Sequence, residues 1–309
     1  MISTAMRAFF LWLSNRRWLG KLAMATPLVR RMPYRFVAGT TLGQAVEAVR
    51  AINATGATAT LDVLGEAVAD RAAADRAAAA YVATIERIAA EKLDANVSIK
   101  LTQMGLDLGD DECLAVMAPV AAAGTRHGVF IRIDMESSAY TERTLDIVHR
   151  LRGEGHDIGP VIQSYLHRSP ADVERLAAEC VRTRICKGAY AEPPEVALQE
   201  REAIGDAFVT LCQRLLEADA YPGVATHDQE MLSRVAAFAE ERRIGKDRYE
   251  FQMLYGIRRD LQRQLQADGH RLRVYVPYGT EWYPYFMRRL AERPANVLFV
   301  LRSVIGDRG

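Results

Sequence analysis

Two stretches decide the fold, Val97-Ser98-Ile99-Lys100-Leu101 and Val129-Phe130-Ile131-Arg132-Ile133-Asp134-Met135. In each stretch, the residues at odd-numbered positions are aliphatic from end to end. The residues at even-numbered positions, which form the other parity of the strand and point to its opposite face, include polar or charged groups such as Lys100 and Asp134. Strands of an open parallel sheet are covered on both faces and are usually apolar throughout. A closed barrel explains the alternation, because the aliphatic parity meets the outer helices and the polar parity lines the interior.

Eight stretches of strand length alternate with Ala/Leu/Glu/Arg-rich stretches typical of helices. The expected strands are Thr58–Leu64, Val97–Leu101, Val129–Met135, Val161–Leu166, Thr183–Cys186, Val224–Thr226, Phe251–Tyr255 and Leu272–Val276. Repeated strand–helix units indicate a parallel sheet, and eight units in about 270 residues fit a distorted (β/α)8 TIM-type barrel. The alternative is a doubly wound open sheet, which would call for a glycine-rich phosphate turn, and no GxGxxG occurs.

Composition excludes several classes of protein. The chain has 309 residues, half of them hydrophobic, and a net charge of +1, which gives no electrostatic case for binding nucleic acid. Its four cysteines form no CxxC or Cys/His pattern, so we expect free thiols in a reducing compartment and no metal site. No apolar stretch approaches the roughly 20 residues that span a bilayer, so we expect a cytoplasmic protein.

The first 46 residues differ from the rest. They contain seven Lys or Arg and no Asp or Glu, with Phe, Trp and Leu interleaved between residues 9 and 19. Basic residues mixed with aromatic ones can mark a membrane-surface segment. The simpler interpretation is a helical arm packed on the main domain, and the two are compatible. We therefore expect an N-terminal basic helical arm over residues 1–46 and a barrel catalytic domain over residues 47–309.

The last expected helix carries the sharpest local pattern. Tyr285, Arg288, Arg289 and Glu292 fall at i, i+3, i+4 and i+7, which places them on one helix face. The forked guanidinium donors of arginine suit carboxylate or phosphate groups. Together with Lys100, which comes at the end of the second expected strand, the arginine pair predicts an anionic ligand at the barrel mouth.

At the strand ends, where barrel enzymes keep their working residues, the chain resembles the proline dehydrogenase family. The resemblance is carried in order by residues 34–39, 61–66, 99–102, 133–136, 163–165, 184–190, 225–227, 251–256, 275–279 and 285–296. Its most specific elements are Lys187-Gly188-Ala189-Tyr190 and the Tyr-x-x-Arg-Arg-x-x-Glu pattern from Tyr285 to Glu292. By its length, the chain resembles the monofunctional bacterial type rather than the type fused to an aldehyde dehydrogenase.

The resemblance implies an FAD-binding barrel without a dinucleotide-binding motif, and it implies roles for particular residues. The substrate carboxylate is expected on Lys100, Arg288 and Arg289, with Tyr275, Tyr285 and Leu254 completing the pocket. FAD contacts are expected from Met135, Gln163, Arg184, Lys187, Gly188, Ala189, Thr226, His227 and Glu292. Glu66 is expected to pair with Arg288 when the site is empty, as a gate.

The implied reaction is the oxidation of L-proline to Δ1-pyrroline-5-carboxylate, the first step of proline catabolism, by hydride transfer to flavin N5. Asp134 and Arg184 are the expected catalytic residues: Arg184 would lie near N5 and favour the reduced flavin, and Asp134 would orient Lys100 or Arg184. The family passes its electrons to a membrane quinone. This implies peripheral association with the inner face of the membrane, for which the basic arm is the candidate contact.

Two other functions remain open from the residues alone. A lysine at a strand end, Lys100 or Lys187, could form a Schiff base with a carbonyl substrate, as in class I aldolases. The barrel could also bind a carboxylate without catalysis. A yellow protein with flavin absorbance would separate the proline dehydrogenase hypothesis from the first alternative, and turnover of a dye acceptor with proline would separate it from the second.

Overall fold

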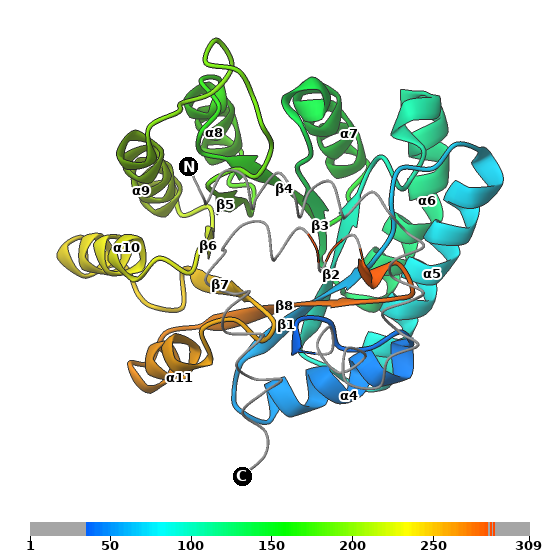
Figure 1. Cartoon of the computed structure of the whole chain (residues 1–309), viewed down its shortest axis with the longest axis horizontal. Helices are drawn as coiled ribbons and strands as arrows, with labels where there is room; N and C mark the ends of the chain where they lie inside the picture. Colours follow the sequence, from blue (N-terminus) through cyan, green and yellow to red (C-terminus); the bar gives the residue numbers. More distant parts are fainter. Residues whose placement is uncertain (1–34, 284, 286, 288–309) are drawn as a thin grey trace.

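The computed structural model describes residues 35–283, 285 and 287, and these residues form a closed barrel of eight parallel strands in chain order (Figure 1). The strands are β1 (Thr58–Val63), β2 (Ala95–Lys100), β3 (Ile131–Asp134), β4 (Ile158–Gln163), β5 (Arg184–Cys186), β6 (Gly223–Ala225), β7 (Glu250–Leu254) and β8 (Leu272–Tyr278). The barrel closes where β1 pairs with β8 from Thr58 beside Arg273 to Val63 beside Tyr278. The expected barrel is confirmed, and the open-sheet alternative is wrong.

Helices ring the strands (Figure 1). They are α4 (Leu42–Asn53), α5 (Arg71–Ala90), α6 (Asp110–His127), α7 (Thr141–Gly153), α8 (Ser169–Ala178), α9 (Arg201–Glu217), α10 (Gln229–Glu241) and α11 (Arg259–Ala267), with short 3-10 turns η2 (Leu106–Leu108) and η3 (Ser138–Tyr140). Capping contacts near the first turn mark where some of these helices begin. For α5, the Asp70 side chain accepts the backbone N–H of Ala73 at 2.7 Å, which is the usual N-cap contact.

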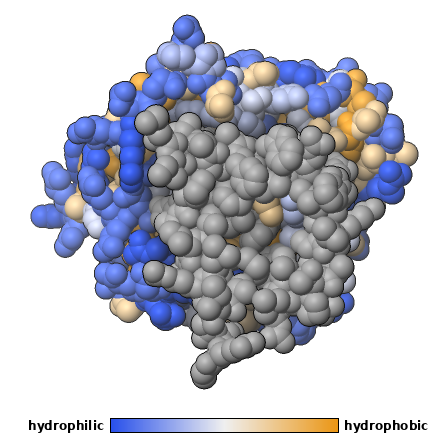
Figure 2. Space-filling view, viewed as in Figure 1, coloured by the Kyte–Doolittle hydropathy of each residue, from blue (hydrophilic) through white to orange (hydrophobic). Residues whose placement is uncertain are grey.

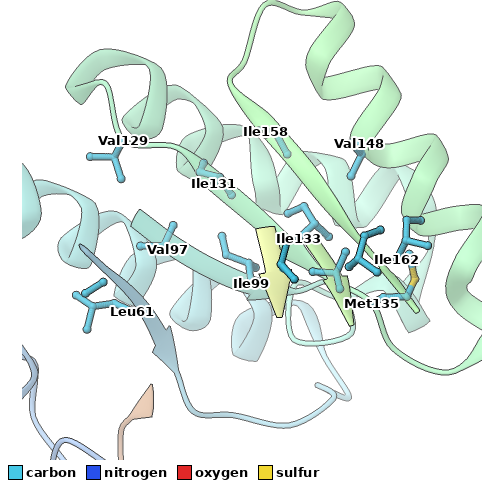
Figure 3. Close-up of a cluster of buried hydrophobic side chains, with 14 of the residues drawn as sticks. Leu61, Val97, Ile99, Val129, Ile131, Ile133, Met135, Val148, Ile158 and Ile162 are labelled. Carbon is cyan, nitrogen blue, oxygen red and sulfur yellow. The ribbon is translucent and has the colours of Figure 1, made fainter. Parts of the chain in front are cut away.

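The aliphatic and polar residues that alternate along the strands point to the expected faces. Leu61, Val97, Ile99 and Ile133 are fully buried on the outer side of the strands. Figure 3 shows this aliphatic cluster gathering around the strands together with Val148 from α7. The opposite parity points into the barrel and is polar, so the interior is filled by hydrogen-bonded and charged side chains rather than by aliphatic layers.

The fourth strand begins three residues earlier than its expected start at Val161. Gly159 and Pro160, which precede the expected start, both lie inside β4. A Cβ on Gly159 would lie 2.1 Å from the carbonyl oxygen of Arg182, and the carbonyl of Pro160 accepts from the Arg132 guanidinium at 2.9 Å. The glycine permits close backbone approach at a crowded strand level, which is one of the recognised uses of glycine in a strand.

The described part of the N-terminal arm is continuous with the barrel. Helix α4 spans the boundary expected between residues 46 and 47. Phe36 and Val37 pack with Leu64, and with Trp282, Tyr283 and Tyr285 beyond β8. Residues 1–34 lie outside the described residues, so the expected helical and membrane-contacting character of the arm stays a prediction.

The outer surface fits a barrel wrapped by amphipathic helices. In Figure 2 the coloured part of the visible face is mainly hydrophilic. Among residues 35–283, with 285 and 287, no helix is both long and apolar enough to traverse a lipid bilayer.

Candidate functional site

A largely buried ion pair joins the carboxyl end of β3 to the first residue of β5. Asp134, the last residue of β3, accepts from the Arg184 guanidinium of β5 at 2.8 Å and from the Ser98 hydroxyl at 2.6 Å. Its second oxygen accepts from the Tyr275 hydroxyl of β8 at 2.7 Å. Burial by itself would raise the pKa of Asp134, but the positive charges of Arg184 and Lys100 lower it below its ordinary value. Asp134 is therefore held as an anion with most of its hydrogen-bonding capacity already used.

Lys100, at the end of β2, lies between two carboxylates. Its ammonium nitrogen is 3.4 Å from an oxygen of Asp62 and 3.7 Å from an oxygen of Asp134. Burial alone would lower the pKa of Lys100, but Asp62 and Asp134 raise it above its ordinary value. The amine is therefore protonated at neutral pH, which argues against Lys100 as a Schiff-base nucleophile.

Arg184 is fixed on several sides. Its side chain is only 7% exposed; Nε donates to the Gln252 amide oxygen at 2.5 Å, and Nη1 donates to Asp134 and Ser98. The guanidinium also lies over the Tyr275 ring, 5.2 Å from its centroid. Burial, and next the charge of Asp134, raise the pKa of Tyr275 well above its ordinary value, so this phenol is a neutral donor.

Gly188 follows β5 in a conformation that favours glycine. Its φ is +120°, and a Cβ would lie 2.3 Å from the Tyr165 ring. Nearby, the Gln163 amide donates to the Glu136 carbonyl at 2.8 Å and accepts the Ala189 N–H at 3.4 Å. The loop after β5 is thus held close to the ends of β3 and β4, with bare backbone at Gly188.

The ends of β5, β6 and β7 bring three further expected residues together. Lys187 is the first residue after β5, and its ammonium donates to Asp228 at 3.0 Å. The Thr226 hydroxyl accepts the Asp228 N–H at 3.2 Å, and the His227 ring accepts the Leu254 N–H through Nε2 at 2.9 Å. A neutral His227 therefore carries its proton on Nδ1, which makes that nitrogen the donor.

The other expected site residues are less central or lie outside the described part. Met135 is buried in the aliphatic cluster outside the barrel (Figure 3), on the opposite parity from Asp134, so a side-chain contact with a cofactor is not favoured by its position. Tyr285 is buried with Trp282, and Glu66 lies in the loop after β1. Arg288, Arg289 and Glu292 are outside the described residues, so the carboxylate clamp, the gate and their contacts stay predictions.

Two interior residues were not among the expected site residues. Asp62 is fully buried beside Lys100, and Gln252 is nearly buried against Arg184. The signal for both was the polar parity of β1 and β7, which also holds purely structural groups such as Glu250. Within the described ranges, no group of three or more His, Cys, Asp or Glu side chains is placed to hold a metal ion.

Known proteins are similar to this chain over most of its length. The family model described as proline dehydrogenase matches residues 45–302. Proline dehydrogenase 1 of Bacillus subtilis (strain 168) is 39% identical over 302 residues, covering 97% of this chain and 99% of that protein. The proline dehydrogenase of Deinococcus radiodurans is 40% identical over 276 residues, covering 88% and 89% of the two chains.

A solved structure agrees. Proline utilization A (PutA) from Bdellovibrio bacteriovorus, inactivated by N-propargylglycine, has a TM-score of 0.81 to this chain at 25% identity. The match covers 91% of this chain and 34% of the other, so this chain spans about a third of that protein's length.

Proposed function

The chain belongs to the proline dehydrogenase family, which carries out the first step of proline catabolism, and from that premise we propose that it oxidises L-proline to Δ1-pyrroline-5-carboxylate with bound FAD. The observation that carries the proposal is the largely buried Asp134–Arg184 pair inside the barrel. A guanidinium held this firmly in a site of low dielectric is a preorganised positive charge, the device that stabilises developing negative charge during a reaction.

The residues at the ends of β4 to β7 fit a flavin dinucleotide. Lys187, His227 Nδ1 and the Thr226 hydroxyl are donors suited to phosphate and ribose oxygens. The missing side chain of Gly188 lets the Tyr165 ring pack against the backbone there, which holds the loop after β5 beside these donors. When bound, FAD supplies the two-electron acceptor for the hydride on the proline ring carbon next to nitrogen.

The protein's own contribution is to position proline. We assign the carboxylate to Arg288 and Arg289, with Lys100 as a weaker third partner because Asp62 and Asp134 already balance its charge. Tyr275, Tyr285 and Leu254 would enclose the ring, and Glu66 would pair with Arg288 in the empty site. Holding the reacting carbon in place is worth several kcal/mol of the barrier, up to roughly 7–11 in favourable cases.

The cluster around Asp134 orients groups and does not take a proton. Lys100 is protonated, Tyr275 is neutral, and the pKa of Asp134 is lowered. None of the three is therefore poised to accept the amine proton of proline. We accordingly propose that proline reacts in the form whose amine is already neutral, so that its nitrogen lone pair can assist departure of the hydride.

The clamp is tested by stopped-flow flavin reduction with L-proline. Arg289→Met and Arg288→Met should keep their flavin, absorb at the flavin wavelengths and lose about 100-fold or more in proline affinity, since each removes one charged hydrogen-bonding partner of the carboxylate. Arg263→Met on α11, away from the strand ends, is the matched control. Unchanged proline affinity in both clamp variants would refute the assignment, and a colourless wild-type protein would refute the function.

Reoxidation by a membrane quinone would bring the enzyme to the lipid surface, and the basic arm is the proposed contact. Seven cations without an acid in residues 1–46 support it, because each basic residue near an anionic surface is worth about 1 kcal/mol. Flotation with vesicles of anionic phospholipid should recover the intact chain and much less of a chain lacking residues 1–34. Equal recovery of the two would contradict the proposal.

A further inference from the structure

Arg184 is connected to a second ion pair deep in the barrel through the side chain of Gln252. The Gln252 oxygen accepts from Arg184 Nε at 2.5 Å, and the Gln252 nitrogen donates to Glu250 at 2.6 Å. Glu250 in turn accepts from Arg273 Nε at 2.6 Å, and Arg273 donates to the Ala59 carbonyl at 2.7 Å. The chain of contacts therefore runs from Asp134 through Arg184, Gln252 and Glu250 to Arg273.

Each link in this chain joins a donor to an acceptor, and the charges alternate in sign. A guanidinium can only donate and a carboxylate can only accept, so the neutral amide of Gln252 has one orientation that satisfies both neighbours. Burial alone would raise the pKa of Glu250, but the charge of Arg273, with hydrogen bonds from Arg273 and Gln252, lowers it. Glu250 is thus an anion, and its charge favours the orientation in which Gln252 turns its oxygen to Arg184.

The barrel makes room for this contact by means of a glycine. Arg184 on β5 and Glu250 on β7 are separated by β6, and in the register of the sheet Gly223 of β6 lies between them. A Cβ on Gly223 would lie 2.4 Å from the Gln252 nitrogen. The bare strand position therefore holds the space through which the side chains of β5 and β7 meet.

We propose that Gln252 is a positioning residue for the reaction: it sets the plane of the Arg184 guanidinium from below, while Asp134 and Ser98 hold it from the side. The inference rests on the proposed function, since it gives Arg184 the part of stabilising the reduced flavin. Gln252 reaches the reacting atoms only through Arg184. Its loss should therefore change the rate of flavin reduction and the flavin midpoint potential, but not the binding of a proline-like carboxylate.

The first test is Gln252→Met, which keeps the length of the side chain and removes the amide. We expect retained flavin, a flavin reduction rate about 10- to 100-fold lower, a more negative midpoint potential, and a dissociation constant for tetrahydro-2-furoate, a ring carboxylate without the amine, within about twofold of wild type. Gln252→Asn, which keeps an amide on a shorter side chain, should recover part of the potential. A wild-type rate and potential in Gln252→Met would overturn the inference.

The second test displaces Gln252 without changing it. Gly223 has no left-handed φ, so Gly223→Ala changes the space around the amide rather than the strand backbone. Gly223→Ala should lower the reduction rate and the thermal midpoint in the wild-type background and have little further effect in a Gln252→Ala background, where no amide remains to be displaced. Gly43→Ala on α4, where a Cβ meets nothing within 4 Å, is the matched control.

The outcomes separate the inference from the function beneath it. Independent effects of Gly223→Ala and Gln252→Ala on the thermal midpoint would overturn the inference whether or not a flavin is bound. If proline does not reduce the flavin bound to the wild-type protein, the proposed function is overturned. Non-additive effects of Gly223→Ala and Gln252→Ala on the thermal midpoint would still support the contact between Gln252 and Arg184.

Discussion

Two carboxylates share the ammonium group of Lys100, and this sharing decides what the residue can do. Asp62 is fully buried, and burial raises its pKa above the ordinary value despite the opposing charge of Lys100. A carboxylate in such a place gains its main compensation from the cation beside it. Lys100 is thus a fixed positive charge with little nucleophilic character, although its position at a strand end would suit either role.

We predict that Asp62→Asn makes Lys100 more reactive. The substitution removes the largest of the negative charges that raise the pKa of Lys100 and leaves a side chain of the same shape. Acetylation of Lys100 by acetic anhydride at pH 8, followed by peptide mass spectrometry, should be several-fold faster in the variant, because the fraction of free amine rises as the pKa falls. The exposed Lys92 is the internal control, and equal labelling of Lys100 in both proteins would contradict the prediction.

We predict that Gly188→Ala costs more than backbone strain. Gly56 and Gly188 both have positive φ, +84° and +120°, but a Cβ on Gly56 meets nothing within 4 Å, whereas one on Gly188 would lie 2.3 Å from the Tyr165 ring. Gly56→Ala should cost about 1 kcal/mol of unfolding free energy, and Gly188→Ala about 2–4 kcal/mol together with weaker flavin binding. Urea unfolding and flavin titration measure the two effects; equal costs at the two sites would refute the argument.

At the scale of elements, strand identity was predictable and strand limits were not. The alternation on β2 and β3 gave the barrel, because parity depends only on neighbours along the chain. The start of β4 carries no local strand signal, since glycine and proline usually mark turns. Only the approach of Arg182 from the neighbouring strand connection explains a glycine at position 159. Contacts between segments distant in sequence leave no local pattern.

We predict that Gly159→Ala weakens the junction between β4 and β5. Its Cβ would meet the Arg182 carbonyl oxygen at 2.1 Å, and a backbone atom cannot turn aside as the end of a side chain can. The unfolding free energy should fall by about 3 kcal/mol, the upper part of the range for overpacking. Gly153→Ala at the end of α7, where a Cβ meets nothing within 4 Å, should leave it unchanged or slightly higher. A similar unfolding free energy for the two variants would show that β4 can move away from the Arg182 carbonyl at no cost in stability.

Across the whole molecule, charge of both signs runs through the barrel interior from Arg273 to Asp134. Because an unpaired buried charge is costly, such charges are expected to be paired or to serve a ligand. The resemblance implied that Asp134 orients Lys100 or Arg184, and the geometry has Asp134 contacting both. Which charges pair could not be predicted from the sequence. Alternation along a strand shows which side chains point into the barrel, but not how far along the barrel axis side chains from different strands meet. Gln252 and Glu250 both point into the barrel from β7. Only the pairing register of β5, β6 and β7, in which Gly223 lies between Arg184 and Glu250, determines which side chain each of them contacts.

The Glu250–Arg273 pair should govern part of the acid sensitivity of the barrel. The pKa of Glu250 is lowered from its ordinary value of 4.5, so the pair stabilises the fold fully above pH 4.5, and this stability is lost as the pH falls through the lower folded-state pKa. Glu250→Gln should therefore lower the unfolding free energy by about 2–4 kcal/mol at pH 7, and its difference from wild type should shrink steadily below pH 4.5. Thermal unfolding from pH 7 to pH 3 tests this, with Glu86→Gln on the exposed face of α5 as the control. A difference that stays constant down to pH 3 would mean that the hydrogen bonds of Glu250, rather than its charge, stabilise the barrel. The alternating charges from Asp134 to Arg273 would then contribute nothing electrostatic to the unfolding free energy.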